Sequence, residues 1–214
     1  MDVLVACAYV VGAYGAGAVP WGVILGRVFI GTDLRDHGSG STGTTNAYRV
    51  LGWRYSVAVL VLDFLKGMLP VLLVRWLGVD GWIVAAVGVA AAAGHCWSPF
   101  IGFRGGKAMA TGAGATIAMV PPLALVVIPM ALIVLWTRYV SLASIIGSLI
   151  AAVGVVVGAI LGHVPVPYAV GCVIIIAVIL LRHRGNFERL MDGTERRLSR
   201  PTSRPRGAKR AAPS

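Results

Sequence analysis

Long apolar runs recur along almost the whole chain, separated by short polar segments. Such runs are long enough to cross a lipid bilayer, where every backbone polar group must find a partner within the chain. Hydrophobic residues make up 57% of the sequence and charged residues 13%, and the mean hydropathy is +0.83. These values exclude an ordinary soluble domain. The sequence therefore predicts an all-α membrane protein with seven transmembrane helices. The predicted spans are 3–30, 55–77, 82–97, 108–120, 122–137, 140–161 and 168–181.

The basic residues give the orientation. With seven crossings, most Lys and Arg residues at the ends of the spans or between them fall on one side, while Arg75 falls on the other. Cytoplasmic loops carry the excess of basic residues in membrane proteins. The N-terminus is therefore predicted outside, with the C-terminus and the polar loops at the cytoplasmic face. The residues on the basic side are Arg27, Arg35, Arg49, Arg54, Arg104, Lys107, Arg138 and those of the C-terminal tail.

The net charge of +11 would also suit a nucleic-acid partner. Because the cations follow the ends of the apolar runs and the tail, they indicate membrane topology and anionic lipid headgroups instead, and no nucleic acid is expected. Cys7, Cys96 and Cys172 lie inside apolar runs without a CxxC or Cys/His spacing. That arrangement predicts no disulfide framework, no zinc site, no metal dependence and no cofactor.

The most informative polar segment is residues 38–49, GSGSTGTTNAYR. Its glycines, Gly38, Gly40 and Gly43, allow backbone N–H groups to turn toward one point. Hydroxyl side chains add donors, and Arg49 adds a planar cationic fork that matches a phosphate. A flexible Gly/Ser connector between two helices is the alternative interpretation of the same segment.

The second predicted span carries Asp63 and Lys66 three residues apart, so both lie on one helical face and can pair. Charged residues within a membrane face the bundle interior and are functional candidates. A structural ion pair between helices is the equally weighted alternative.

Two further polar segments follow later in the chain. The group Arg104-Gly105-Gly106-Lys107 opens directly into an apolar helix, which predicts two cations flanking exposed backbone amides at a helix N-terminus. These cations could equally be membrane anchors on the cytoplasmic side. After the last span, His183 and Asn186 lie three residues apart and share one helical face.

All three polar segments return to the same predicted membrane face. Together they predict one site for an anionic, phosphate-bearing substrate at the cytoplasmic interface. The predicted membrane domain covers 1–198. Residues 199–214 are rich in Arg, Pro, Ser and Ala, which predicts a disordered basic tail near anionic lipid.

These motifs resemble those of the bacterial acyl-phosphate-dependent glycerol-3-phosphate acyltransferase family, over nearly the whole chain up to Glu195. The first motif corresponds to 38–46 with Arg49, the second to 63–67, 94–95 and 105–107, and the third to 183–186 and 193–195. Three positions depart from the family pattern. Ser41 replaces a usual Asn, Arg104 a common Lys, and Ala108 a usual Gly.

The resemblance implies transfer of a fatty acyl group from acyl phosphate to the 1-hydroxyl of glycerol 3-phosphate, in the bacterial plasma membrane. Partners would then be both substrates and membrane lipids. The residues expected to carry the reaction are Ser39, Arg49, Lys107, His183 and Asn186. Those expected to bind substrate are Gly38, Gly40, Gly43, Thr44, Thr45, Asn46, Lys66, Arg104, Gly105 and Gly106. The proton acceptor is either His183 or a substrate phosphate oxygen. An organic-phosphate transporter is the competing function, because it would share phosphate-binding loops and buried charges.

Overall fold

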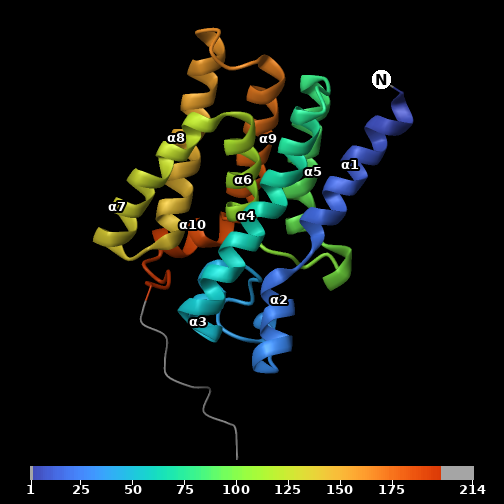
Figure 1. Cartoon of the computed structure of the whole chain (residues 1–214). Helices are drawn as coiled ribbons and strands as arrows, with labels where there is room; N and C mark the ends of the chain where they lie inside the picture. The colour runs from blue at the N-terminus through green and yellow to red at the C-terminus, as the bar shows by residue number, and fades with distance from the viewer. Residues whose placement is uncertain (1, 199–214) are drawn as a thin grey trace, which may run out of the picture.

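A computed structural model describes residues 2–198, and the tail predicted for 199–214 lies outside the described residues. The described chain folds into helices without strands, arranged as a bundle (Figure 1). The α-helices are α1 (Val3–Ala18), α2 (Trp21–Leu25), α3 (Thr44–Leu51), α4 (Trp53–Trp76), α5 (Gly81–Cys96), α6 (Met109–Met119), α7 (Val127–Thr137), α8 (Val140–Ile160), α9 (Val166–Arg182) and α10 (Arg184–Met191). Short 3-10 helices cover Leu34–Asp36, Pro99–Ile101 and Pro121–Val126, and a π-helical turn covers Gly26–Ile30.

By length and apolar character, four helical segments can cross a membrane: Val3–Ile30, Trp53–Trp76, Gly81–Ile101 and Val140–Ile160. A fifth results if α9 and α10, which are bent by 52° at their junction, count as one span. The remaining predicted crossings, 108–120 and 122–137, form shorter apolar helices at Met109–Met119 and Pro121–Thr137. The all-helical membrane class is therefore confirmed, while the count of seven and the orientation stay predictions.

The first apolar run is broken near Pro20. Because proline has no N–H and fixes its own φ, α1 ends at Ala18 and α2 begins at Trp21. The break leaves carbonyl groups without their helical donors. Ser98 Oγ donates to the Ala18 carbonyl at 2.6 Å, and Lys66 Nζ donates to the Val19 carbonyl at 2.8 Å. Side chains from neighbouring helices thus satisfy the broken helix inside the bundle.

Small residues allow the central helices to pack closely. A Cβ atom at Gly17 would overlap the backbone of Ala91 where α1 meets α5. A Cβ atom at Gly67 would overlap the carbonyl of Thr111 where α4 meets α6. Apolar side chains lose no water contact when helices associate in lipid, so close backbone approach supplies the packing energy.

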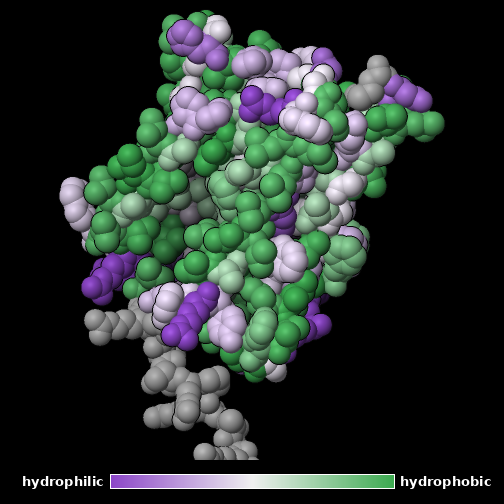
Figure 2. All heavy atoms as spheres, viewed as in Figure 1, coloured by the Kyte–Doolittle hydropathy of each residue, from purple (hydrophilic) through white to green (hydrophobic). Residues whose placement is uncertain are grey.

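The polar segments gather at one end of this bundle. In Figure 1, α2, α3, α10 and the α7–α8 turn lie at the lower end, while the N-terminus and the α8–α9 turn lie at the upper end. Figure 2 shows apolar side chains covering most of the middle of the viewed face. This distribution is typical of a membrane protein in which the middle of the bundle contacts lipid and the two ends contact water.

Candidate active site

The buried Asn46 side chain forms hydrogen bonds with the backbone of the glycine-rich segment and of the residues just before it. Its side chain is buried on α3, and its Oδ1 accepts the Ser39 N–H at 2.9 Å. Its Nδ2 lies 2.8 to 3.1 Å from three backbone carbonyl oxygens, those of Leu34, His37 and Ser41. The Asn46 amide is therefore fully hydrogen-bonded to the loop, and it holds the loop conformation.

The glycines of this segment adopt different backbone conformations. Gly38 and Gly40 have φ values of 63° and 68°, in the left-handed region that glycine adopts readily. Gly43 has an extended backbone and precedes α3, whose first residues are Thr44 and Thr45. No side chain caps this helix N-terminus, so its first amides and the exposed Ser39 side chain remain available to a ligand.

Both the N–H groups and the carbonyl groups of Gly105 and Gly106 are hydrogen-bonded within the protein. The Gly105 and Gly106 N–H groups donate to the carbonyls of Cys96 and His95, each at 3.1 Å. Arg182 donates from Nε to the Gly106 carbonyl and from Nη2 to the Gly105 carbonyl, also at 3.1 Å. The prediction of exposed amides at a helix N-terminus is therefore wrong for Gly105 and Gly106, because both N–H groups donate to carbonyls at the end of α5.

This arrangement places Lys107 beside the last polar segment. Lys107 Nζ donates to Asn186 Oδ1 on α10. Asn186 Nδ2 in turn donates to Glu195 Oε1 at 2.7 Å, and the same carboxylate accepts from Ser141 Oγ and from Arg189 Nε, each at 2.8 Å. Partial burial acts to raise the pKa of Glu195, but these hydrogen bonds outweigh it and lower that pKa.

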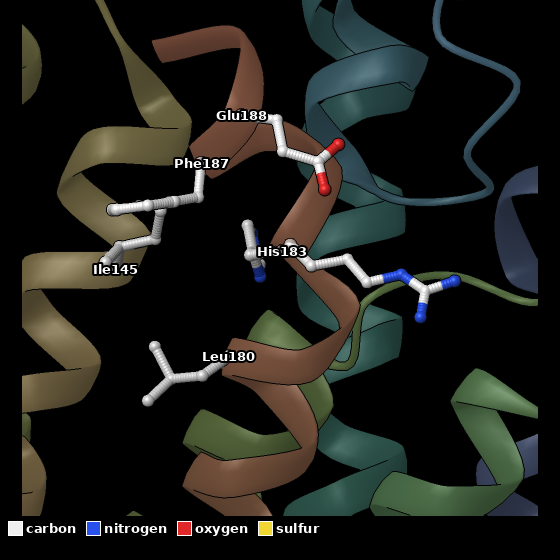
Figure 3. A pocket seen from close by; sticks show the side chains of 6 residues that line it. Ile145, Leu180, His183, Phe187 and Glu188 are labelled. Atoms are coloured by element: carbon white, nitrogen blue, oxygen red, sulfur yellow. The ribbon is translucent and has the colours of Figure 1, made fainter. Parts of the chain in front are cut away.

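His183 lies at the bend between α9 and α10. Its Nδ1 is 2.8 Å from the Ile179 carbonyl, which can only accept, so Nδ1 carries the proton and Nε2 is left as an acceptor in the neutral ring. The ring borders a cavity of about 290 Å³, shown in Figure 3 with Leu180, Phe187 and Ile145 around it. The cavity is otherwise lined by Arg184 and Glu188.

Other predicted residues lie outside this network. Lys66 is buried in α4, where its Nζ lies 2.7 Å from Asp63 Oδ1 as well as contacting the Val19 carbonyl. The predicted ion pair is therefore present within α4, and Lys66 also links α4 to the break between α1 and α2. Arg104 is exposed on the loop before Gly105.

Ala108 adopts φ 55°, a left-handed conformation that favours glycine. The departure from the family pattern at this position thus falls where glycine would fit best.

The sequence interpretation missed Arg182 and Ser141. Arg182 is one of several basic residues at a helix end, and Ser141 lies inside an apolar run. Glu195 belongs to the third motif but is not among the predicted site residues. The one sequence signal for Arg182 is its place immediately before His183.

The chain is similar to known proteins over most of its length. A family model described as "Glycerol-3-phosphate acyltransferase" matches residues 7–193. Glycerol-3-phosphate acyltransferase of Rubrobacter xylanophilus is 42% identical over 185 residues, which cover 86% of this chain and 90% of the relative. The protein of the same name from Geobacter sulfurreducens is 44% identical over 188 residues, covering 86% of this chain and 93% of the relative.

Solved structures agree with this result. The crystal structure of the integral membrane glycerol 3-phosphate acyltransferase PlsY (YgiH) in its glycerol 3-phosphate form has a TM-score of 0.84 and 40% identity, covering 91% of this chain and 96% of that one. The lysophosphatidic acid form has a TM-score of 0.81 and 38% identity, covering 90% and 95%. The match in sequence and fold spans the three polar segments, so the chain belongs to the glycerol-3-phosphate acyltransferase family.

Proposed function

We propose that this protein transfers a fatty acyl group from acyl phosphate to the 1-hydroxyl of glycerol 3-phosphate, giving lysophosphatidic acid and inorganic phosphate. The observation that carries the proposal is the contact of Lys107 with Asn186, which joins the second and third polar segments 79 residues apart. Family membership supports glycerol 3-phosphate as the acceptor, and the crystal structure of the relative in its glycerol 3-phosphate form agrees with it.

The reaction needs positioning more than it needs a covalent enzyme intermediate, because acyl phosphate is already activated and its leaving group is a stable anion. The 1-hydroxyl oxygen attacks the acyl carbonyl carbon and forms the new ester C–O bond. The bond between the carbonyl carbon and the phosphate oxygen then breaks, and phosphate departs with the bonding electrons. In the proposed arrangement, His183 Nε2 or a phosphate oxygen takes the hydroxyl proton.

Each residue has a role in this scheme. The Ser39 hydroxyl and the first amides of α3 donate to one phosphate, and Arg49 and Lys107 neutralise the two phosphate groups. Asn186 holds the Lys107 ammonium in place and is itself held by Glu195. His183 orients the acceptor hydroxyl from the bend between α9 and α10.

The acyl chain enters from the lipid between helices in this proposal. A small crevice of about 50 Å³ lies between α6, α7, α8 and α9, and it is lined mainly by apolar side chains such as Ile117, Leu123 and Ile176. Met109, two residues after Lys107, also lines this crevice. This apolar lining close to Lys107 supports entry of the acyl chain between these helices.

Comparison of acyl donors tests the proposal. Purified protein in detergent, given glycerol 3-phosphate, should form lysophosphatidic acid and release inorganic phosphate with acyl phosphate, but should be inactive with acyl-CoA or acyl carrier protein. Product from all donors would overturn the donor assignment and leave the acyltransferase activity. A transporter would form no product with any donor, and the structural use of Asp63 and Lys66 also weighs against that alternative.

We also propose that the site faces the cytoplasm at the bacterial plasma membrane. Single cysteines introduced at Ser39 and Arg104, which are exposed, should react with a membrane-impermeant maleimide in inside-out vesicles and not in intact spheroplasts. A cysteine-free background removes Cys7, Cys96 and Cys172. Labelling of the two positions from opposite sides of the membrane would refute a shared site.

The activity should fall at alkaline pH. Burial lowers the pKa of Lys107 to about 8, so the free enzyme loses this cation as the pH rises past that value. Since only the charged ammonium attracts phosphate, kcat/KM should drop about tenfold per pH unit above the apparent pKa. Kinetics between about pH 6.5 and 9.5 measure this effect. Lys107→Arg keeps the charge throughout the range, so any residual activity of this variant should show no such decline.

Gly106→Ala should lower activity while the protein stays folded. A Cβ atom there would overlap His95 Nε2 and lie 3.0 Å from Thr42 Oγ1. The loop that carries Lys107 would have to move, and displacement of a catalytic group by about 1 Å can cost about 10²-fold in rate. Gly154→Ala on α8 serves as a control, because its Cβ would meet no heavy atom within 4 Å and its backbone is helical. Equal activity of both variants would argue against tight positioning of the loop.

A further inference from the structure

The segment after α10 crosses from α10 to the α7–α8 turn. We refer to Gly193–Leu198 as the C-terminal strap. At its start, the Thr194 and Glu195 N–H groups donate to the Arg189 carbonyl. At its end, the Leu198 N–H donates to the Arg138 carbonyl at 2.7 Å. The strap is thus tied to the bundle on both sides of its middle residues.

Arg196, in the middle of the strap, contacts both ends of the glycine-rich segment. Its Nη1 donates to the Gly38 carbonyl at 2.5 Å. Its own carbonyl accepts from Arg49 Nη2 at 3.3 Å. The Arg49 guanidinium therefore contacts the backbone of Arg196, the Arg196 guanidinium contacts the residue before the exposed Ser39, and the two charges act on each other.

This pair of like charges has no ion-pair partner among residues 2–198. The charge of Glu195 acts on Arg49, but the two Glu195 oxygens already accept from Ser141, Asn186 and Arg189. The sequence from 199 to 214 contains no Asp or Glu. Burial, and after it the charge of Arg196, lower the pKa of Arg49. A fold that holds two such cations together provides a site for a doubly charged anion.

We propose that Arg196 is a second guanidinium ligand of the acceptor phosphate, paired with Arg49, and that the pair selects a dianionic phosphate monoester over a monoanionic phosphodiester. The inference rests on the proposed function, because it assigns the charge class of the acceptor at that site. A phosphate monoester carries a charge of about −1.5 to −2 near pH 7 and presents three acceptor oxygens. A guanidinium has five N–H donors, so Arg196 can keep its bond to Gly38 and still donate to phosphate.

Arg196→Gln separates this role from a simple structural tie. Glutamine keeps an N–H donor for the Gly38 carbonyl but loses the charge. The KM for glycerol 3-phosphate should rise about tenfold to a hundredfold, the loss expected for one charge-assisted hydrogen bond, with kcat little changed. Arg196→Lys should raise KM less. If Arg196 only ties the loop, Arg196→Gln will keep the wild-type KM, and the proposal is wrong.

Arg197→Gln is the matched control. Arg197 is also exposed on the strap, and its substitution removes the same charge. Its guanidinium, however, contacts the Tyr139 hydroxyl at the α7–α8 turn. Its KM for glycerol 3-phosphate should equal that of the wild type. Equal increases in both variants would indicate a general charge effect and would overturn the proposal.

The selectivity itself can be measured by binding. Calorimetry in detergent should show that wild-type protein binds glycerol 3-phosphate more tightly than its methyl phosphodiester, and that Arg196→Gln narrows this ratio. An unchanged ratio would refute the arginine pair. Because binding needs no turnover, this experiment remains decisive even if the donor assay fails, and it therefore distinguishes the two proposals.

Discussion

Arg49→Ala should lower kcat/KM by about 10³-fold, close to the detection limit, while the protein remains folded. Arg49 is the cation of the first polar segment, and its Nη2 contacts the strap carbonyl of Arg196 at the proposed phosphate site. Removal of one preorganised electrostatic group from an active site typically costs about 10² to 10³ in rate. The measurement is initial-rate kinetics with acyl phosphate and glycerol 3-phosphate, alongside size-exclusion chromatography to verify folding.

Arg54→Ala is the matched control for Arg49. Arg54 lies five residues later, on the first turn of α4, where its guanidinium stacks over the exposed Trp53 ring. The substitution removes the same charge from the same end of the bundle and should leave kcat/KM unchanged. Arg49→Lys should recover only part of the activity, because an ammonium cannot donate to phosphate through a planar fork. Full activity in Arg49→Ala would remove this residue from the site.

Asp63→Ala should destabilise the protein more than any surface substitution. The Asp63 side chain is 2% exposed and pairs with Lys66, whose side chain is 6% exposed. His95 Nδ1 lies 3.7 Å from the same carboxylate oxygen. Removing one partner leaves a buried charge uncompensated, which costs about 3 to 5 kcal/mol. Thermal unfolding of the purified protein in detergent should show the loss as a markedly lower Tm.

Two further variants test whether the loss of the ion pair causes the lower Tm. Asp63→Ala combined with Lys66→Met removes both charges and should recover part of the stability, although the Val19 carbonyl then loses its donor. Asp36→Ala changes an exposed residue at the end of the 3-10 helix Leu34–Asp36, and it should leave the Tm unchanged. If the double variant were no more stable than Asp63→Ala alone, the ion pair would not be the cause.

The residues of the proposed site could be selected from the sequence because phosphate chemistry requires particular residue types in short segments. Gly38, Arg49, Lys107 and Asn186 supply suitable groups locally, and the fold brings their segments to one end of the bundle. The use of each polar group could not be predicted in the same way. Asn46 and Lys66 have suitable chemistry for a ligand, but both bond to backbone carbonyls of the protein itself.

The sequence by itself determined the helical membrane class, the polar segments and the pairing of Asp63 with Lys66, since apolar run length and helical spacing act over neighbouring residues. Only the tertiary structure decided which amides are free, where Arg182 and Glu195 act, and that Arg196 meets Gly38 across 158 positions. These contacts depend on where Pro20 breaks the first helix and on how closely glycine lets α1, α4, α5 and α6 approach. Such distances arise from packing between helices, and no local pattern in the chain encodes them.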